Sequence, residues 1–262
     1  MTTEPAAVMT RPSLALVAQG AKRTVLNGAV YDYRAGQFLV ASLDLPVTGL
    51  VLEGSAEQPF AVMTVALEPA LVAALLLEAP APPASVVTGL AVSDASAELV
   101  DAAVRMLGLL DRPADVPVLA DAYRREILWR LLGSEQGGLV RQIGAADGSL
   151  ARVARSVRWI REHYAEPLRV EELAEIARMS PSAFHRHFRS ATSMTPIQFQ
   201  KQIRLQEART LLLATADDIA GVGFRVGYDS PSQFSREYRR TFGEPPARDA
   251  RRLRATSRPR VV

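Results

Sequence analysis

The sequence predicts an α+β protein in which short antiparallel strands come first and helices follow. Three observations indicate this class. Short runs before residue 70 alternate in hydrophobicity and are separated by turn residues, which is typical of strands. From Ala95 onward the apolar residues recur at three- and four-residue steps, which is typical of helices. A ten-residue segment near the C-terminus also repeats an earlier one, so the second half contains two copies of one helical unit.

Five or six short strands are predicted in the first 70 residues. Asn27-Gly28 separates two of them and is the strongest short signal for a β-hairpin. Strands of this length with turns between them favour a small antiparallel barrel or sandwich. The expected strands span 13–18, 24–26, 29–33, 37–43, 49–52 and 60–66, and 86–91 is a candidate for one more.

Amphipathic helices are predicted after the strands. Pro69 begins an apolar helix over 70–78, and two longer helices follow, the first beginning at Ala95 and the second spanning 118–133. The two longer helices could close the open face of the barrel or form the seam of a dimer. A helix over 150–164 opens the second half of the chain.

Charge is distributed unevenly along the chain. Residues 1–150 carry a net charge of −6 and residues 151–262 a net charge of +9, and every Lys or Arg of the second half except Lys201 is an arginine. Such an excess attracts polyanions, and arginine both binds phosphate and reads guanine edges. The second half is therefore expected to bind a polyanionic partner.

Several kinds of chemistry are not expected. Cysteine is absent, which excludes disulfides and thiolate metal sites, and all three histidines lie in the basic half. No phosphate-binding glycine loop, nucleophile elbow or acid–base pair is recognisable, so we expect no enzyme, no catalytic residue, no metal and no cofactor. The chain lacks a bilayer-length apolar run and a secretory signal. It is therefore expected in the cytoplasm without a membrane partner.

The internal repeat relates Ser180–Arg189 to Ser230–Arg239. Six of the ten positions are identical, and each copy begins with Ser-Pro, which is a helix start signal. A short helical segment precedes each copy, so each unit predicts a helix, a tight turn and a capped helix, the helix-turn-helix arrangement. Pro196–Leu213 predicts a linking helix ~27 Å long. Such a spacing would let the capped helices enter major-groove segments about one helical turn, or ~34 Å, apart.

Helical periodicity separates the buried face of each capped helix from its exposed face. Phe184 and Phe188 share one face in the first copy, and Phe234 and Tyr238 do so in the second. The opposite faces carry short polar residues and arginines, which suit base edges and phosphates. An ordinary solvated face is the alternative for one helix, but two copies with the same pattern favour DNA contact. The candidate DNA-binding residues are Ser182, His185, Arg186, Arg189, Ser232, Gln233, Ser235, Arg236 and Arg239.

These motifs resemble the AraC/XylS family of bacterial transcription regulators. The resemblance covers residues 150–252 and is most specific at Gly227-Tyr228-x-Ser230, Phe234-Ser235-Arg236-x-Tyr238 and Gly243-x-x-Pro246. It implies a DNA-binding domain with two helix-turn-helix motifs. Two departures are Gly223, where the family usually has alanine, and Asp249-Ala250, where an aromatic–arginine pair often closes the domain.

The first half resembles, less specifically, the N-terminal effector or dimerisation domain of one AraC subgroup. The residues that carry this resemblance lie in 14–20 and 33–47. It implies a cupin-like barrel that senses a small molecule. The expected organisation is an effector-sensing or dimerisation domain at 1–135, a linker at 136–149, a DNA-binding domain at 150–252 and an unstructured basic tail at 253–262.

Three functions compete at this point. The first is a sequence-specific regulator whose partners would be double-stranded DNA, a small-molecule effector, a second copy in a homodimer and, for an activator, RNA polymerase. The second is a sequence-tolerant basic DNA-associated protein whose first half serves only for oligomerisation. The third, a barrel enzyme tethered to DNA, is disfavoured by the missing histidines and cysteines. The repeated pattern of exposed Ser, Gln and Arg favours the first. Effector-binding residues stay unassigned, because either face of the strands carrying Tyr33 and Phe38 could be interior.

Overall fold

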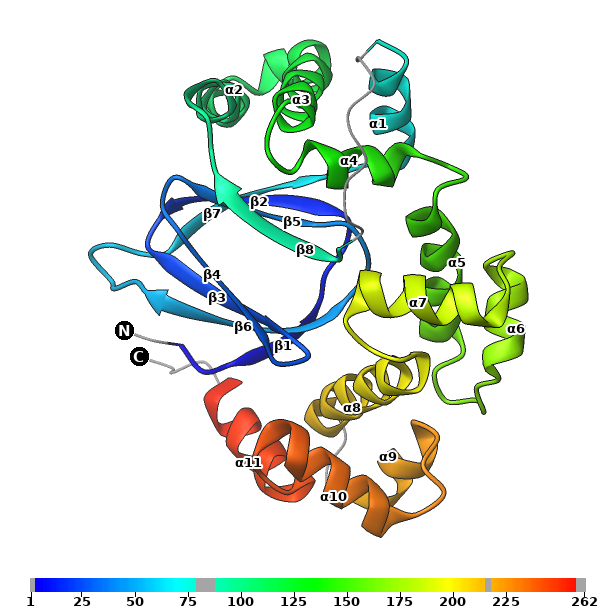
Figure 1. The fold of residues 1–262 in the computed structure, drawn as a ribbon. Coiled ribbons are helices and arrows are strands. Elements are labelled where there is room, and N and C mark those ends of the chain that lie inside the picture. Colours follow the sequence, from blue (N-terminus) through cyan, green and yellow to red (C-terminus); the bar gives the residue numbers. More distant parts are fainter. Residues whose placement is uncertain (1–2, 79–87, 215–217, 258–262) are drawn as a thin grey trace.

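The computed structural model describes residues 3–78, 88–214 and 218–257. It contains a pair of β-sheets, a group of helices beside one sheet, and a bundle formed by the C-terminal helices (Figure 1). This arrangement confirms the predicted α+β class. Within the described ranges, no helix combines the length and apolar character that a membrane crossing requires.

Two four-stranded antiparallel sheets form the N-terminal part, in the orders β1-β6-β3-β4 and β7-β2-β5-β8. No ladder joins the two sheets among the described residues, so the cupin-like barrel is open. Asn27-Gly28 forms the predicted hairpin turn between β3 and β4, with both residues at positive φ. The strands are β1 (Ala6–Met9), β2 (Ser13–Gln19), β3 (Ala21–Leu26), β4 (Ala29–Arg34), β5 (Gln37–Ala41), β6 (Pro46–Glu53), β7 (Ala61–Ala66) and β8 (Leu90–Asp94).

Two strands differ from the sequence-based expectation. Strand β1 was not predicted, because its four residues carry a weak alternating pattern, and it pairs with β6 through Ala6 to Met9. The strand expected at 86–91 is found at Leu90–Asp94, where it pairs with β5. Residues 86 and 87 lie outside the described residues.

The second sheet buries side chains on both faces. Leu14 and Phe38 of neighbouring strands share one buried face, and helices α3 and α4 lie beside this sheet (Figure 1). Ala15, Leu39 and Ala41 alternate with them along the strands and line a space between the two sheets. Alternation along the strands therefore directs one set of side chains into the core and the other toward the space between the sheets.

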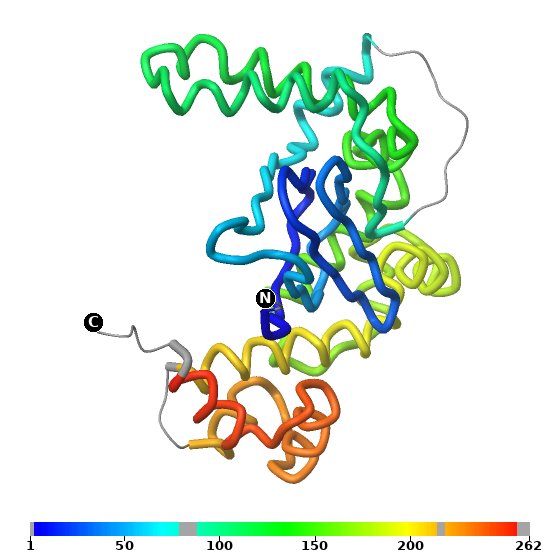
Figure 2. The backbone as a smooth tube through the Cα atoms, turned by 90° about the vertical axis from the view of Figure 1, so that its left-hand side faces the viewer, coloured from blue at the N-terminus to red at the C-terminus, as the bar shows by residue number. Residues whose placement is uncertain are grey.

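Helices from the middle of the chain lie on the outer side of this sheet (Figure 1). They are α1 (Pro69–Leu76), α2 (Ala97–Leu107), α3 (Val116–Leu132) and α4 (Gly137–Gly144), with 3₁₀ turns at Gly108–Asp111 and Pro113–Asp115. Figure 2 shows α2 and α3 as a paired arm that extends beyond the sheets. Helix α4 lies inside residues 136–149, the segment that was expected to be a linker. Its side chains Leu139, Val140 and Ile143 are buried, so this segment packs as part of the fold.

The C-terminal bundle contains α5 (Ser149–Glu162), α6 (Val170–Ile176), α7 (Pro181–Thr192), α8 (Pro196–Ala214), α9 (Ile219–Arg225), α10 (Pro231–Phe242) and α11 (Pro246–Ser257). Helix α8 confirms the predicted linking helix. Helix α11 was not predicted, and residues 253–257 of the expected unstructured tail continue it. This part of the prediction was wrong, because Asp249 and Ala250 are buried and anchor the helix. Residues 258–262 of the expected tail lie outside the described residues.

Polar contacts join the sheets to the C-terminal bundle at separate points. One contact reaches α5, one reaches the end of α7, and one reaches α11. They are the ion pair of Asp44 with Arg161, the hydrogen bond from the Asn27 amide to the Ser193 carbonyl at 2.6 Å, and the ion pair of Glu4 with Arg252. The sheets therefore contact both halves of the helical repeat.

Candidate nucleic-acid interface

The two helix-turn-helix units repeat down to their backbone hydrogen bonds. Helices α6 and α9 end in the same Schellman motif, in which a residue just past the helix takes a left-handed conformation. That residue is Arg178 in the first unit, at φ 53°, and Gly227 in the second, at φ 91°. The paired bonds are Met179 N to Ala174 O with Arg178 N to Glu175 O, and Tyr228 N to Gly223 O with Gly227 N to Phe224 O, all between 2.8 and 3.0 Å.

Two glycines of the second unit permit close packing. A Cβ atom on Gly227 would lie 2.3 Å from the carbonyl oxygen of Ala165, so a larger residue would push this turn away from the end of α5. A Cβ atom on Gly223 would lie 3.0 Å from the ring of Phe234. Gly223, one of the two departures from the family pattern, thus lets α9 lie close against α10.

Capping and aromatic packing fix the second helix of each unit. The Oγ atom of Ser180 accepts a hydrogen bond from Ala183 N, and Ser230 does the same for Gln233 N. These contacts confirm the predicted N-caps. On the inner faces, Phe184 and Phe188 pack with their ring centres 5.3 Å apart, and the Phe234 and Tyr238 rings lie 5.6 Å apart. All four aromatic side chains are fully buried, as predicted.

The predicted contact residues divide into exposed and half-buried groups. All four in α7 are exposed, as are Ser232, Arg236 and Arg239 in α10. Gln233 and Ser235 were expected to be exposed and are half-buried, because they flank Phe234 at the border of the packed face. The Gln233 amide also donates a hydrogen bond to Glu237 at 3.2 Å, which turns it toward the protein.

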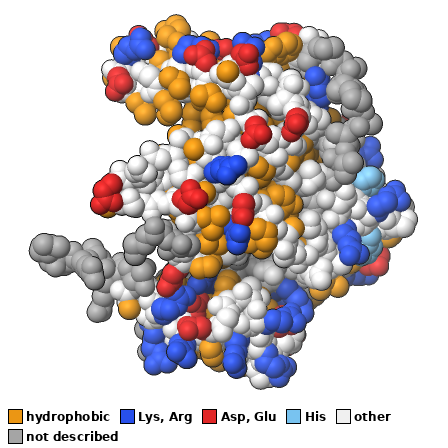
Figure 3. All heavy atoms as spheres, turned by 60° about the vertical axis from the view of Figure 1, so that its left-hand side comes forward, with side chains coloured by type: hydrophobic (Ala, Val, Ile, Leu, Met, Phe, Trp, Pro, Cys, Tyr) orange, Lys and Arg blue, Asp and Glu red, His pale blue; other side chains and the backbone are white. Residues whose placement is uncertain are grey.

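Positive side chains gather over the C-terminal bundle. Figure 3 shows Lys and Arg side chains along the lower and right-hand margins of this face, while the upper part mixes both charges. The asymmetry in net charge between the halves of the sequence thus becomes an asymmetry of the surface, which suits a polyanionic partner.

Arg204 of α8 holds the two units together, a role that no local pattern in the sequence predicted. Its guanidinium donates to the carbonyl oxygens of Tyr164 at 2.7 Å, Glu166 at 2.9 Å, Ala165 at 3.3 Å and Gly227 at 2.6 Å. The first three carbonyls lie between α5 and α6, and the fourth lies in the turn of the second unit. Burial lowers the pKa of Arg204 from its ordinary value, but an arginine stays charged at neutral pH.

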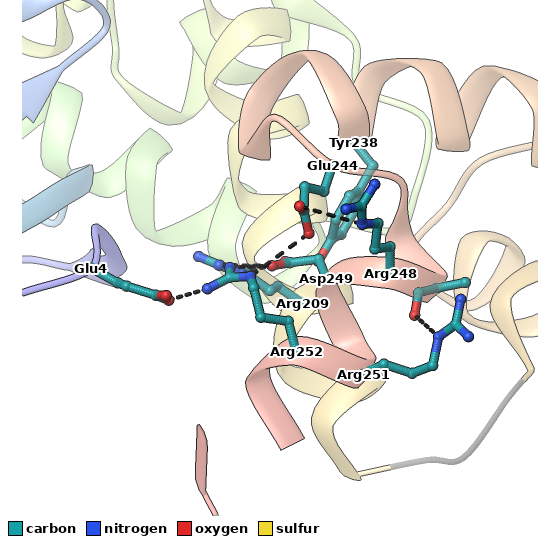
Figure 4. A network of polar contacts seen from close by, with 9 residues as sticks. Glu4, Arg209, Tyr238, Glu244, Arg248, Asp249, Arg251 and Arg252 are labelled. Carbon is teal, nitrogen blue, oxygen red and sulfur yellow. Dashed lines mark hydrogen bonds and ion pairs between the residues drawn. The ribbon is translucent and has the colours of Figure 1, made fainter. Parts of the chain in front are cut away.

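A buried carboxylate, Asp249, anchors helix α10 through the hydroxyl of Tyr238. Its oxygens accept hydrogen bonds from Arg209 of α8 at 2.9 and 3.2 Å, from the Tyr238 hydroxyl at 2.8 Å and from Arg252 at 2.6 Å (Figure 4). Burial acts to raise the pKa of Asp249, but these donors outweigh it and hold the pKa below its usual value. Burial and the bond to Asp249 raise the pKa of Tyr238. The second departure from the family pattern is therefore the centre of a polar network.

Comparisons with known proteins agree with this architecture. The model of the AraC-type transcriptional regulator N-terminus matches residues 1–139, and the model of a helix-turn-helix domain matches residues 173–252. The chain belongs to the AraC-type transcriptional regulators. This membership confirms the resemblance found in the sequence.

Curated relatives of this AraC-type regulator include transcriptional activators. The HTH-type transcriptional activator RhaS of Salmonella schwarzengrund is 29% identical over 153 residues, which cover 57% of this chain and 53% of the relative. RhaS of Salmonella arizonae is 30% identical over 152 residues, with the same coverage. The chain thus spans about half the length of the curated relatives it matches.

Solved structures of ToxT from Vibrio cholerae share the fold of this AraC-type regulator. Apo ToxT matches with a TM-score of 0.56 at 11% identity, over 94% of this chain and 92% of ToxT. ToxT with a bound unsaturated fatty acid matches with a TM-score of 0.56 at 12% identity, over 94% of this chain and 90% of ToxT. The likeness at this identity concerns the fold alone.

Proposed function

We propose that the protein is a sequence-specific DNA-binding transcription regulator in which α7 and α10 enter adjacent segments of the major groove. The repeat carries this proposal: two capped helices bury aromatic residues on one side and expose serine and arginine on the other. Helix α8, with its 19 residues, connects them. At a rise of ~1.5 Å per residue it is ~28 Å long, which approaches the ~34 Å turn of B-DNA.

Selection from a random duplex library by the full-length protein, at two salt concentrations, tests this function. A motif with two short half-sites about one helical turn apart is expected. Binding that falls steeply with salt and selects no motif would support the sequence-tolerant alternative instead, because counterion release does not depend on base sequence.

Arg186→Ala and Arg236→Ala are each expected to relax base preference at one position and to weaken specific binding by ~1–3 kcal/mol. Both arginines are exposed on the outer faces of their helices, where guanidinium groups can read base edges. Competition binding with single-base variants of the selected site measures the effect. Arg34→Ala, an exposed arginine of β4, is the control. Uniform weakening on all sequences would assign the two arginines to phosphate contacts.

We infer that a small-molecule effector acts through the space between the two sheets. This cavity has a volume of about 470 Å³, which is within the range of small-molecule sites. Its wall contains the Lys22 ammonium, whose pKa burial lowers, and the hydroxyls of Thr24 and Tyr33, which lie 3.1 Å apart. These polar groups in a mostly apolar wall could orient a ligand. The fatty acid bound to ToxT, a protein of the same fold, supports ligand control.

RNA polymerase is the further partner that activation would require. The curated relatives are named as transcriptional activators, which supports the same direction of control here. Transcription from a promoter carrying the selected site, measured with purified polymerase, is expected to rise when the protein is added. A fall in transcription would assign repression instead.

A homodimer through α2 is also proposed. Val100, Val104 and Leu107 recur at steps of four and three on one face of α2 and remain exposed, with Val104 exposed at 60%. Asp101 and Arg105 border this stripe, so an antiparallel copy could place opposite charges side by side. The arm formed by α2 and α3 is free of the sheets at its end, as Figure 2 shows.

Val104→Glu is expected to raise the dimer dissociation constant at least ~10-fold, because an unpaired carboxylate would be buried in the seam. Sedimentation velocity over a concentration series measures this constant. Val30→Glu places the same charge on an exposed position of β4 and should leave it unchanged. A wild-type protein that stays monomeric at all concentrations would contradict the proposed dimer.

A further inference from the structure

A second cavity lies between the N-terminal part and α5, apart from the space between the sheets. Its volume is about 540 Å³, which also falls within the range of small-molecule sites. Three parts of the chain build its wall: the loop after β5, the start of α1 with the end of α4, and one face of α5. Apolar lining residues include Leu43, Ala73, Ile143, Leu150 and Ala154.

Two arginines of α5, Arg155 and Arg158, give this apolar wall a positive edge. Arg158 is exposed and makes no ion pair or hydrogen bond within the described parts of the chain. Among the described residues, Arg155 donates only to the carbonyl oxygen of Ile176, at 3.3 Å. Asp44 also lines the cavity, but its carboxylate is paired with Arg161 and leaves the other two cations uncompensated. An anion placed here would satisfy guanidinium donors that the protein leaves open.

We propose that this cavity binds an amphipathic organic anion, with its apolar body against Leu43, Ala73 and Ala154 and its anionic group at Arg155 and Arg158. The ligand would touch the loop after β5 and the first helix of the C-terminal bundle at once. Its binding depends on the cavity alone, whereas any effect on transcription rests on the proposed DNA-binding function.

The position of Arg155 links the cavity to the first helix-turn-helix unit. Arg155 bonds the last carbonyl of α6, and its neighbour Ser156 donates to the Leu173 carbonyl of the same helix at 2.8 Å. An anion that draws the Arg155 guanidinium away would weaken one of these two attachments. A ligand at this site therefore acts on the element that positions α7.

A matched pair of fluorescent probes tests the site on the full-length protein without DNA. The probes are 8-anilinonaphthalene-1-sulfonate and N-phenyl-1-naphthylamine, which share an apolar body and differ in the sulfonate. Each is titrated against the wild type and against Arg158→Ala, Arg158→Lys and Ala154→Trp. Arg152→Ala is the control, because Arg152 lies on the same helix, bonds the Asp147 and Arg178 carbonyls and does not line the cavity.

The expected results distinguish the contribution of the arginine charge to probe binding from the contribution of the cavity's shape. Arg158→Ala should weaken sulfonate binding ~10-fold and leave the neutral probe within about twofold, since the substitution removes one charge-assisted contact. Arg158→Lys should restore much of the loss, and Ala154→Trp should abolish saturable binding of both probes by filling the cavity. The Arg152→Ala control should match the wild type.

Two results would overturn the proposal. One is a folded Ala154→Trp variant that binds the sulfonate as the wild type does, which would place the probe on another apolar surface such as the exposed stripe of α2. The other is an Arg158→Ala variant with no selective loss of sulfonate binding, which remains decisive even if the tryptophan variant does not fold. Neither result involves DNA, so failure here leaves the proposed regulator function untouched.

Discussion

Replacing Asp249 with alanine is expected to lower the free energy of unfolding by ~3–5 kcal/mol, because it leaves buried partners of a carboxylate uncompensated. Arg209 is only 13% exposed and Asp249 is not exposed at all, so water cannot readily replace the lost acceptor. The Tyr238 hydroxyl would lose its acceptor as well. Urea unfolding followed by circular dichroism measures the loss. Arg248→Ala, at an exposed arginine of the same helix, should change stability by less than ~0.5 kcal/mol.

The contribution of Asp249 should also depend on pH. Its folded-state pKa lies below the usual value, so its stabilising effect is complete above the unfolded-state pKa of ~3.9. The effect is lost as the pH falls through the lower, folded-state pKa. The stability difference between the wild type and Asp249→Asn should therefore be constant at neutral pH and shrink below about pH 4. A difference that persists unchanged in acid would show that the charge of Asp249 does not matter.

Arg204→Met is expected to cost ~3 kcal/mol of stability, since it removes a half-buried arginine that bonds four backbone carbonyls. Each hydrogen bond to a charged group contributes ~1.5–3 kcal/mol when it is shielded from water, and less where it is exposed. The methionine keeps much of the apolar length of the side chain, so the loss reports mainly on the guanidinium. Thr210→Ala, at an exposed position of α8 whose hydroxyl bonds only its own helix, is the control.

The same variant should change the spacing preference on DNA more than the affinity for one half-site. Arg204 ties the segment between α5 and α6 to the turn at Gly227, so without it the two units can shift relative to each other. Binding to duplexes whose half-sites are moved apart by one base pair at a time measures this. An unchanged preference for one spacing would mean that α8 and the aromatic cores fix the geometry by themselves.

Local signals in the sequence predicted much of the fold. Asn27-Gly28 predicted the position of a hairpin. A two-residue hairpin turn requires positive φ angles, and asparagine and glycine adopt them more readily than other residues. The Ser-Pro starts and the Phe184–Phe188 spacing located α7, and their repetition located α10. Such features depend on neighbours within a few positions, so they can be recognised without knowing the rest of the structure.

The parts that escaped prediction depend on residues far apart in the chain. Arg204 meets its carbonyl partners across 23 to 40 positions, and Asp249 meets Arg209 across 40. On the sequence both residues resemble ordinary charges on a helix surface. The half-burial of Gln233 has a similar origin, because its helix is covered by neighbours whose placement no local pattern reveals. The DNA contacts of the exposed faces stay a prediction.

The polar contacts between the sheets and the C-terminal bundle have a consequence for the choice of operator. Glu4 holds α11, which packs against α10, while Asp44 and Asn27 hold α5 and the end of α7. In the free protein these contacts therefore help, together with α8 and Arg204, to hold α7 and α10 at one relative angle. A DNA site that matches this angle can bind with the contacts intact, and one that requires another angle must break them. In the proposed complex, operator selection is therefore shared by Glu4, Asn27 and Asp44, residues outside the two recognition helices.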